Sequence, residues 1–232
     1  MSLGTPRLHL RATDSTNLRA RALAAAGAPH GTLVTASSQD AGRGRQGRAW
    51  TAPAGRALLM SVVVREPSPL LSLAAAVAVA DVCAARGRSA QIKWPNDVLL
   101  DGRKVCGILV EGRPQERWAV LGIGLNVALR PDDFPAELRD RAGTLGLEPA
   151  DVEPVLAELL AALAAHLDAS DADVLAAWRA RDWLCGRDIA WNGGRGVADG
   201  VDEAGHLLVR LPDGARTALD AGEVHLERLP RR

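Results

Sequence analysis

Gly42-Arg43-Gly44-Arg45-Gln46-Gly47-Arg48, followed by Trp50, is the segment that tests for a dinucleotide-binding fold. It matches the G-x-G-x-x-G pattern, which requires a helix to begin within the glycine turn and hold a pyrophosphate at its N-terminus. Here an apolar, β-branched run resumes by Ala57, so there is too little room for that helix. The segment is therefore predicted to be a mobile loop whose glycines and arginine forks bind carboxylate or phosphate oxygens. A solvated surface loop or an RGG-like nucleic-acid tail remains an alternative.

The chain on both sides of this loop is predicted to form strands and helices. Strand-like runs cover residues 8–11, 31–36, 56–64, 90–94, 98–100, 105–111 and 118–128, and helical spacing covers 14–26, 70–85, 152–167 and 174–183. After residue 184, short apolar runs at 188–191, 196–201, 206–211, 217–219 and 223–226 alternate with turn signals such as Asn192-Gly193-Gly194. We therefore expect an α/β or α+β main domain over residues 1–183 and a small β domain over residues 184–232.

Composition excludes several classes of function. Lysine plus arginine and aspartate plus glutamate number 28 each in 232 residues, which argues against a domain that mainly binds nucleic acid. The three cysteines and five histidines are scattered, so neither a disulfide framework nor a zinc or other histidine metal site is predicted. The apolar run at 70–85 is too short to span a bilayer, and the N-terminus lacks the core of a signal peptide. We expect a cytoplasmic protein that does not contact membranes.

Four further motifs carry polar groups at the ends of predicted strands or helices. Lys93-Trp94-Pro95-Asn96-Asp97 presents an amide and a carboxylate after an extended Trp-Pro turn. Lys104-Val105-Cys106-Gly107-Ile108-Leu109 brings a lysine into an apolar strand, and Gly122-Ile123-Gly124-Leu125-Asn126 places two glycines inside another. Strand-interior glycines indicate close approach by a ligand or another backbone. Asp14-Ser15-Thr16-Asn17 taken alone is a helix cap, and Lys104 taken alone is a solvated edge residue.

In their order along the chain, these motifs resemble those of bacterial biotin–protein ligases. The family pattern is S-T-N, Q-x-A-G-R-G-R-x-G-R-x-W, K-W-P-N-D, K-x-x-G-I-L and G-I/L-N-V, and the chain matches it at residues 15–17, 39–50, 93–97, 104–109 and 122–127. The resemblance implies a mixed sheet with flanking helices, related to class II tRNA synthetases, followed by an SH3-like β-barrel. It also implies an enzyme that forms biotinyl-5′-AMP from biotin and ATP and transfers biotin to a lysine of a carrier protein.

The resemblance also implies roles for individual residues. Catalytic roles are expected for Arg45, Asp97 and Lys104, with Asp97 orienting or deprotonating the acceptor amine. Biotin is expected to contact Ser15, Thr16, Asn17, Gln39, Arg43, Gly44, Arg45, Lys104, Gly107 and Gly124. The nucleotide is expected to contact Arg43, Arg45, Arg48, Trp50, Asn96, Lys104 and Asn126. No protein metal site is expected, because Mg²⁺ would arrive with ATP.

The expected partner is a biotin carboxyl carrier protein or domain of acetyl-CoA carboxylase or a related acyl-CoA carboxylase. Only thirteen residues precede Asp14, so the resemblance implies a form without the N-terminal DNA-binding domain and without direct DNA contact. Asp40 stands where glutamine or threonine is common in the family. A homodimer is left open. The rival hypotheses are a lipoate or octanoate–protein ligase and a non-catalytic biotin-sensing regulator.

Overall fold

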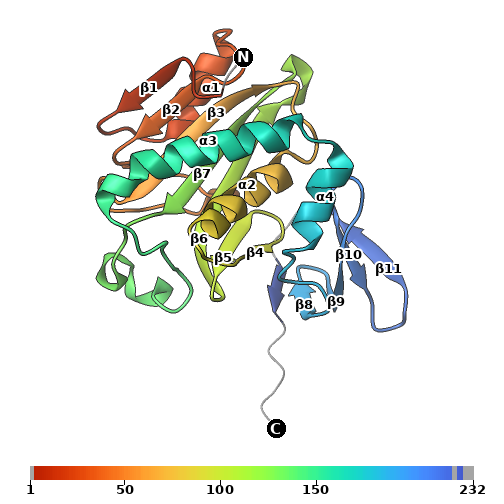
Figure 1. Cartoon of the computed structure of the whole chain (residues 1–232). Coiled ribbons are helices and arrows are strands. Elements are labelled where there is room, and N and C mark those ends of the chain that lie inside the picture. Colours follow the sequence, from red (N-terminus) through yellow and green to blue (C-terminus); the bar gives the residue numbers. More distant parts are fainter. Residues whose placement is uncertain (1–2, 221–223, 227–232) are drawn as a thin grey trace.

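The larger sheet is mixed and has seven strands in the order β1-β2-β3-β7-β6-β5-β4 (Figure 1). This arrangement comes from a computed structural model that describes residues 3–220 and 224–226. β1 and β2 run parallel and the other neighbouring strands run antiparallel, which confirms the predicted mixed sheet. The strands are β1 (Arg7–Leu10), β2 (Leu33–Ala36), β3 (Ala57–Arg65), β4 (Ala90–Lys93), β5 (Asp97–Leu100), β6 (Arg103–Arg113) and β7 (Trp118–Asn126).

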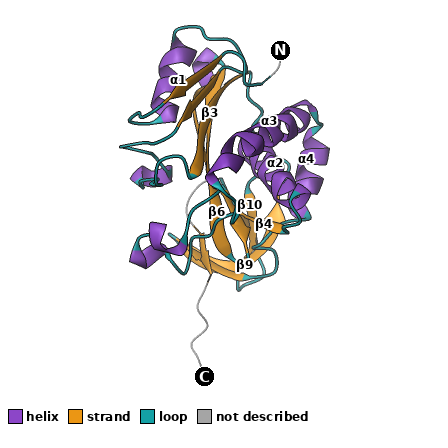
Figure 2. Cartoon of the chain, turned by 60° about the vertical axis from the view of Figure 1, so that its left-hand side comes forward, coloured by secondary structure: helices purple, strands orange, loops and turns teal. Residues whose placement is uncertain are grey.

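Helices cover both faces of this sheet (Figure 2). α1 (Thr16–Ala25) packs against β2, β3 and β7 on one face. α2 (Leu71–Ala85) packs against β4, β5 and β6 on the other, and α3 (Val152–Asp168) and α4 (Asp171–Arg179) pack against α2. Because α2 has neighbours on several sides, it is apolar around nearly its whole circumference. Within the described ranges, no helix combines the length and apolar character needed to cross a membrane.

The pleat of β6 and β7 separates a core face from a face that α1 shares. Leu121 and Ile123 belong to the core that contains α2, whereas Trp118 and Val120 pack with residues of α1. Side chains alternate along a strand, so Gly122 and Gly124 lie on the α1 side. Their directly opposed partners on β6, Leu109 and Gly107, lie there too. The α2 side of β6 and β7 is thus packed with apolar side chains, and the α1 side carries three glycines among its residues, Gly107, Gly122 and Gly124.

The prediction of a helix at 174–183 is wrong at its end. α4 ends at Arg179, and the following residues run alongside β4 instead. Ile92 N donates to Arg181 O (2.8 Å) and Trp183 N donates to Ile92 O (2.9 Å). These bonds pair the backbone N–H and C=O of Ile92 at the edge strand β4, and a helix continued to residue 183 would leave both groups unpaired. Trp183 therefore lies at a junction and is not on a helix.

A second sheet follows, with five antiparallel strands in the order β11-β10-β9-β8-β12. Its strands are β8 (Asp188–Trp191), β9 (Gly194–Val201), β10 (Leu207–Arg210), β11 (Arg216–Leu219) and β12 (Val224–Leu226). They confirm the predicted short strands, although Glu223 lies outside the described residues. The SH3-like barrel and the domain division at 183 and 184 stay predictions. Apolar residues of both sheets, such as Ile123 and Val209, belong to one continuous core.

Trp94 joins the two sheets directly. Its side chain is buried, and its indole Nε1 donates to Gly205 O at 3.0 Å. The tryptophan of the K-W-P-N-D motif therefore ties the second sheet to the first. Asn96 and Asp97, which follow it in the motif, lie on the side of the large sheet that faces α1. Five short 3₁₀ segments complete the chain: η1 (Arg45–Gly47), η2 (Pro114–Glu116), η3 (Pro131–Asp133), η4 (Ala136–Leu138) and η5 (Pro149–Asp151).

Candidate active site

A cavity of about 480 Å³ lies on the α1 side of the large sheet. Its floor is β6 and β7, and its walls are the first residues of α1, the glycine-arginine segment and the chain around η4. Every site residue predicted from the sequence lines it: Ser15, Thr16, Asn17, Gln39, Arg43, Gly44, Arg45, Arg48, Trp50, Asn96, Asp97, Lys104, Gly107, Gly124 and Asn126. The fold thus brings together five motifs that are far apart in the sequence.

The glycine-arginine segment is a tight hairpin. Trp50 N donates to Gly42 O (2.9 Å) and Gly44 N donates to Arg48 O (2.7 Å). The chain reverses at Gln46-Gly47, where φ is +56° and +74°, the left-handed region that a hairpin turn of this kind requires. The segment expected to be a mobile loop therefore has paired backbone hydrogen bonds on both sides of a turn. We call residues 42–50 the glycine-arginine hairpin.

The floor of the cavity is bare backbone where Trp50 covers it. Gly107 and Gly124 are directly opposed on β6 and β7. A Cβ at Gly124 would lie 2.5 Å from Trp50 Cε2, and one at Gly107 would lie 2.9 Å from Trp50 Cζ3. Only glycine leaves room for the indole at these two positions. The buried Trp50 Nε1 has no hydrogen-bond partner within the described part of the chain.

One end of the cavity is lined by the uncharged polar groups of Thr16, Asn17 and Gln39, with the buried Ser61 behind them. We call these four residues the polar end. Gln39 Oε1 accepts from Thr16 N (2.7 Å) and from Thr16 Oγ1 (3.0 Å). Ser61 Oγ lies 2.8 Å from Thr16 Oγ1 and 2.6 Å from Asn17 Oδ1. Ser15 occupies the helix N-cap, but among the described residues its side chain makes no capping hydrogen bond. The polar end therefore fixes donors and acceptors among largely buried residues, where unpaired groups are costly.

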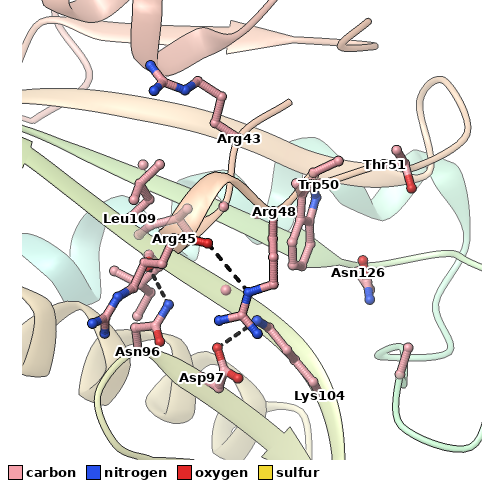
Figure 3. A pocket seen from close by; sticks show the side chains of 18 of the residues that line it. Arg43, Arg45, Arg48, Trp50, Thr51, Asn96, Asp97, Lys104, Leu109 and Asn126 are labelled. Carbon is pink, nitrogen blue, oxygen red and sulfur yellow. Dashed lines mark hydrogen bonds and ion pairs between the residues drawn. The ribbon is translucent and has the colours of Figure 1, made fainter. Parts of the chain in front are cut away.

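The opposite end gathers positive charge, and we call it the cationic end (Arg45, Arg48 and Lys104, with Asp97). Lys104 Nζ lies 2.6 Å from Asp97 Oδ1 and 5.7 Å from the centre of the Trp50 ring. Figure 3 shows Arg48 reaching from the hairpin toward the strand residues Asp97 and Lys104, while the Arg45 side chain extends toward Asn96. Two separate chain segments thus converge with cations on one volume, as the sequence predicts.

Two predicted amides are held by backbone. Asn96 Nδ2 donates to Ile108 O at 2.8 Å, so Asn96 ties β5 to β6 (Figure 3). Asn126 Nδ2 donates to Gly143 O at 2.9 Å and holds the chain that follows η4 against the sheet. Both side chains line the cavity, and each already has a structural partner.

Arg43 differs from the other arginines of the hairpin. It lines the cavity, but its guanidinium turns away from Lys104 (Figure 3). Arg43 Nη1 forms an ion pair with Glu111 Oε1 at 3.4 Å. Glu111 also accepts from Asn17 Nδ2 (3.0 Å) and Arg21 Nη1 (3.2 Å). The predicted contacts of Arg43 with biotin and the nucleotide therefore stay predictions, while its ion pair with Glu111 is what the structure shows.

Sequence reasoning missed several residues that line or support the cavity. Ser61 and Glu111 lie behind its lining, inside apolar strands, and bond to the lining residues Thr16 and Asn17. Their alternation with small residues on the α1 side was the available signal. Phe134, the only phenylalanine of the chain, lines the cavity and packs with Leu59 and Trp50. The second sheet and its junction also contribute, through Trp183 and His225.

The lysines are distributed unusually. Lys93 and Lys104 are the only two in the chain, and both line the cavity. Lys93 Nζ lies 6.0 Å from the centre of the Trp183 ring, on the side where the two sheets meet. All other basic residues are arginines.

We next considered whether the described residues offer a metal site or a reactive thiol. No group of three His, Cys, Asp or Glu side chains is placed to hold a metal ion within residues 3–220 and 224–226. Cys106, next to Gly107 on β6, faces the core, and burial raises the pKa of its thiol well above the usual range. Its neutral thiol is therefore not a nucleophile for this cavity.

Comparisons with known proteins agree with this geometry. The model of the biotin/lipoate A/B protein ligase family matches residues 10–127. The biotin–[acetyl-CoA-carboxylase] ligase of Paracoccus denitrificans is 37% identical, over 93% of this chain and 98% of the relative. The bifunctional ligase/repressor BirA of Bacillus spizizenii is 43% identical, and the chain spans less than half of its length (47%). A biotin protein ligase from Aquifex aeolicus, solved in complex with biotin and ATP, superposes with a TM-score of 0.82 at 28% identity, covering 97% of this chain and 100% of that one.

Proposed function

Because the chain belongs to the biotin/lipoate A/B protein ligase family, we propose that it is a biotin–protein ligase. In the first step, a biotin carboxylate oxygen attacks the α-phosphorus of MgATP and diphosphate leaves, giving biotinyl-5′-AMP. In the second, a carrier lysine amine attacks the biotinyl carbonyl, the anhydride bond breaks and AMP leaves. The observation that carries the proposal is that Arg45, Arg48 and Lys104 line one cavity, in which Arg48 extends toward Lys104 and the far end is polar and uncharged.

The cationic end suits the first step because two anions must meet there. Two unit charges 4 Å apart interact by about 4 kcal/mol at an effective dielectric near 20. Fixed cations offset this repulsion and stabilise charge that develops on the α-phosphate. Lys104 projects from the floor and the hairpin arginines from the wall, so they can approach the reacting oxygens from two sides. Mg²⁺, carried in with ATP, would balance the charge of the leaving diphosphate.

The polar end suits the ureido ring of biotin. That ring has two N–H donors and one carbonyl acceptor, and a site of fixed partners rejects ligands that leave such partners unpaired. Thr16 and Gln39 are held against each other by hydrogen bonds, and Ser15 presents its hydroxyl at the start of α1. Trp50 and the glycine floor would enclose the apolar part and keep water from the mixed anhydride.

The partner proposed for the second step is a biotin carboxyl carrier domain of acetyl-CoA carboxylase or a related enzyme, the acceptor class that the name of the Paracoccus relative implies. A homodimer, the lack of direct DNA contact and a cytoplasmic location remain predictions.

The decisive experiment incubates the protein with biotin, MgATP and a carrier domain known to be competent, and measures the intact mass of the carrier. We expect the carrier to gain one biotinyl group, and a carrier with its acceptor lysine replaced by arginine to gain none. Lipoate or octanoate in place of biotin should not be attached. A carrier that stays unmodified, while the protein binds biotin tightly and forms no adenylate, would instead favour a sensor.

Asp97→Asn tests the second step separately. Asp97 Oδ1 lies 2.6 Å from Lys104 Nζ. We propose that the Asp97 carboxylate takes a proton from the acceptor amine once Lys104 has turned to the anhydride. Loss of this base should slow transfer from preformed biotinyl-5′-AMP by about a hundredfold, with a much smaller effect on adenylate formation. Rapid-quench measurement of each step gives the comparison.

Asp101→Asn is the matched control, since Asp101 follows the same strand but has an 87% exposed side chain paired with Arg88. It should behave as wild type. Transfer at the normal rate in Asp97→Asn would remove Asp97 from the second step.

A further inference from the structure

We infer that Glu111 positions the glycine-arginine hairpin over the cavity and thereby sets how firmly biotin is retained. This inference rests on the proposed function and deepens it. Glu111 lies near the end of β6, on the same face as Gly107 and Leu109, because side chains alternate along a strand. Its side chain is only 20% exposed. A carboxylate this far inside has to be explained by its partners.

Glu111 is the single anion between two cations from different elements. Arg21 comes from α1 and Arg43 from the hairpin, and both approach Glu111 Oε1, at 3.2 and 3.4 Å. Asn17 donates to the other oxygen, Oε2, at 3.0 Å. We call these four residues the Glu111 cluster (Asn17, Arg21, Arg43 and Glu111). Without the carboxylate charge, two guanidinium groups would converge on a neutral point and repel each other.

Such repulsion would act on the hairpin more than on α1. Arg21 belongs to a ten-residue helix that packs on β2, β3 and β7. Arg43 belongs to a hairpin of nine residues, where it pairs with Ala49, and its side chain is 44% exposed. The element with fewer packed neighbours moves more easily. The ion pair between Glu111 and Arg43 therefore fixes the hairpin against strand β6.

The Glu111 cluster is also continuous with the polar end. Asn17 is shared by both, because its amide nitrogen contacts Glu111 and its Oδ1 lies 2.6 Å from Ser61 Oγ. Contacts then run from Ser61 to Thr16 and from Thr16 to Gln39. Gln39 is four residues before Arg43 in the chain, so the contacts close a circuit. Biotin bound at the polar end would therefore stabilise the closed hairpin, and the closed hairpin would slow the release of biotin.

The test compares Glu111→Gln with wild type in two measurements. In the ligand-free protein, trypsin should cut after Arg45 and Arg48 about fivefold faster in the variant, because the hairpin opens more often. In adenylate formation, the KM for biotin should rise about fivefold while kcat changes by less than about twofold, since uniform binding is lost and the cationic end stays intact.

Two single substitutions distinguish whether Glu111 positions the hairpin or supports helix α1. Arg43→Met should reproduce both effects and add nothing to Glu111→Gln in the double variant. Arg21→Met removes the helix contact to the same carboxylate and should leave hairpin cleavage and the KM for biotin near wild type. Glu66→Gln removes an exposed ion pair with Arg117, neither of which lines the cavity, and controls for loss of a negative charge.

Several results would overturn the inference. Wild-type cleavage and KM in Glu111→Gln would do so, as would an Arg21→Met variant with the same defects, which would assign Glu111 to the support of α1. If Glu111→Gln does not fold, Arg43→Met alone decides, because it leaves both α1 contacts in place. The cleavage measurement needs no ligand, so it distinguishes a failure of this inference from a failure of the proposed ligase activity.

Discussion

Lys104→Ala should slow the formation of biotinyl-5′-AMP by about a thousandfold, the scale expected when one preorganised charge is removed from a developing anion. Lys104 is the cation that the floor supplies, and its Nζ lies between Asp97 (2.6 Å) and the Trp50 ring (5.7 Å). The side chain is 34% exposed, and the backbone bonds of residue 104 to Arg141 and Gly143 do not depend on it. The variant should therefore fold. Exchange of labelled diphosphate into ATP, dependent on biotin, measures the step.

The two lysines of the cavity provide the internal control. Lys93→Ala removes the other primary amine, near Trp183 at the junction of the sheets, and should cost far less in the same assay. Lys104→Arg keeps the charge on a planar group of different reach and should recover only part of the rate. A Lys104→Ala enzyme with a rate close to wild type would mean that the hairpin arginines alone neutralise the reacting anions.

Gly122→Ala should lower the free energy of unfolding by about 2 to 3 kcal/mol and weaken biotin binding sharply. A Cβ at this position would overlap the side-chain oxygen of Asn17. Asn17 is 4% exposed and bonded to Glu111, so it cannot move aside without leaving buried polar groups unpaired. Urea unfolding and biotin titration measure the two effects.

A double variant tests the cause. Asn17→Ala removes the overlapping atoms, so Gly122→Ala should destabilise the Asn17→Ala background much less than it destabilises wild type. Strict additivity of the two unfolding free energies would show that Gly122 is needed for some other reason.

Much of the fold follows from local pattern. The long apolar run of β3 is buried along almost its whole length, and α2 is apolar on all sides, so length and composition alone identify both. The hairpin at Gln46-Gly47 was harder to predict, because its backbone bonds depend on a positive φ at Gln46, and glutamine has no preference for that conformation. The end of α4 was misplaced because bonds from the edge strand β4 to residues 181 and 183 compete with helical bonds.

The site was predictable where the family motifs mark it, and less so elsewhere. Lys104, Asp97, Arg45 and Arg48 belong to motifs, and all four line one cavity. Ser61 and Glu111 carry no motif of their own, and their importance appears only when β3 and β6 are aligned beneath α1. Phe134 and Trp183 come from segments whose position relative to the cavity depends on long-range packing, which spacing along one sequence does not encode.

The restriction of lysine to the cavity has a chemical consequence for the proposed formation of an acyl-adenylate. Such mixed anhydrides acylate primary amines, whereas guanidinium groups stay protonated and are poor nucleophiles at neutral pH. With 28 basic residues of which only Lys93 and Lys104 carry an ε-amine, the protein's own exterior is almost free of side chains that an escaping intermediate could label. Reactive product lost to solvent would thus tend to be hydrolysed or to find a foreign amine, and the catalyst itself would remain unmodified.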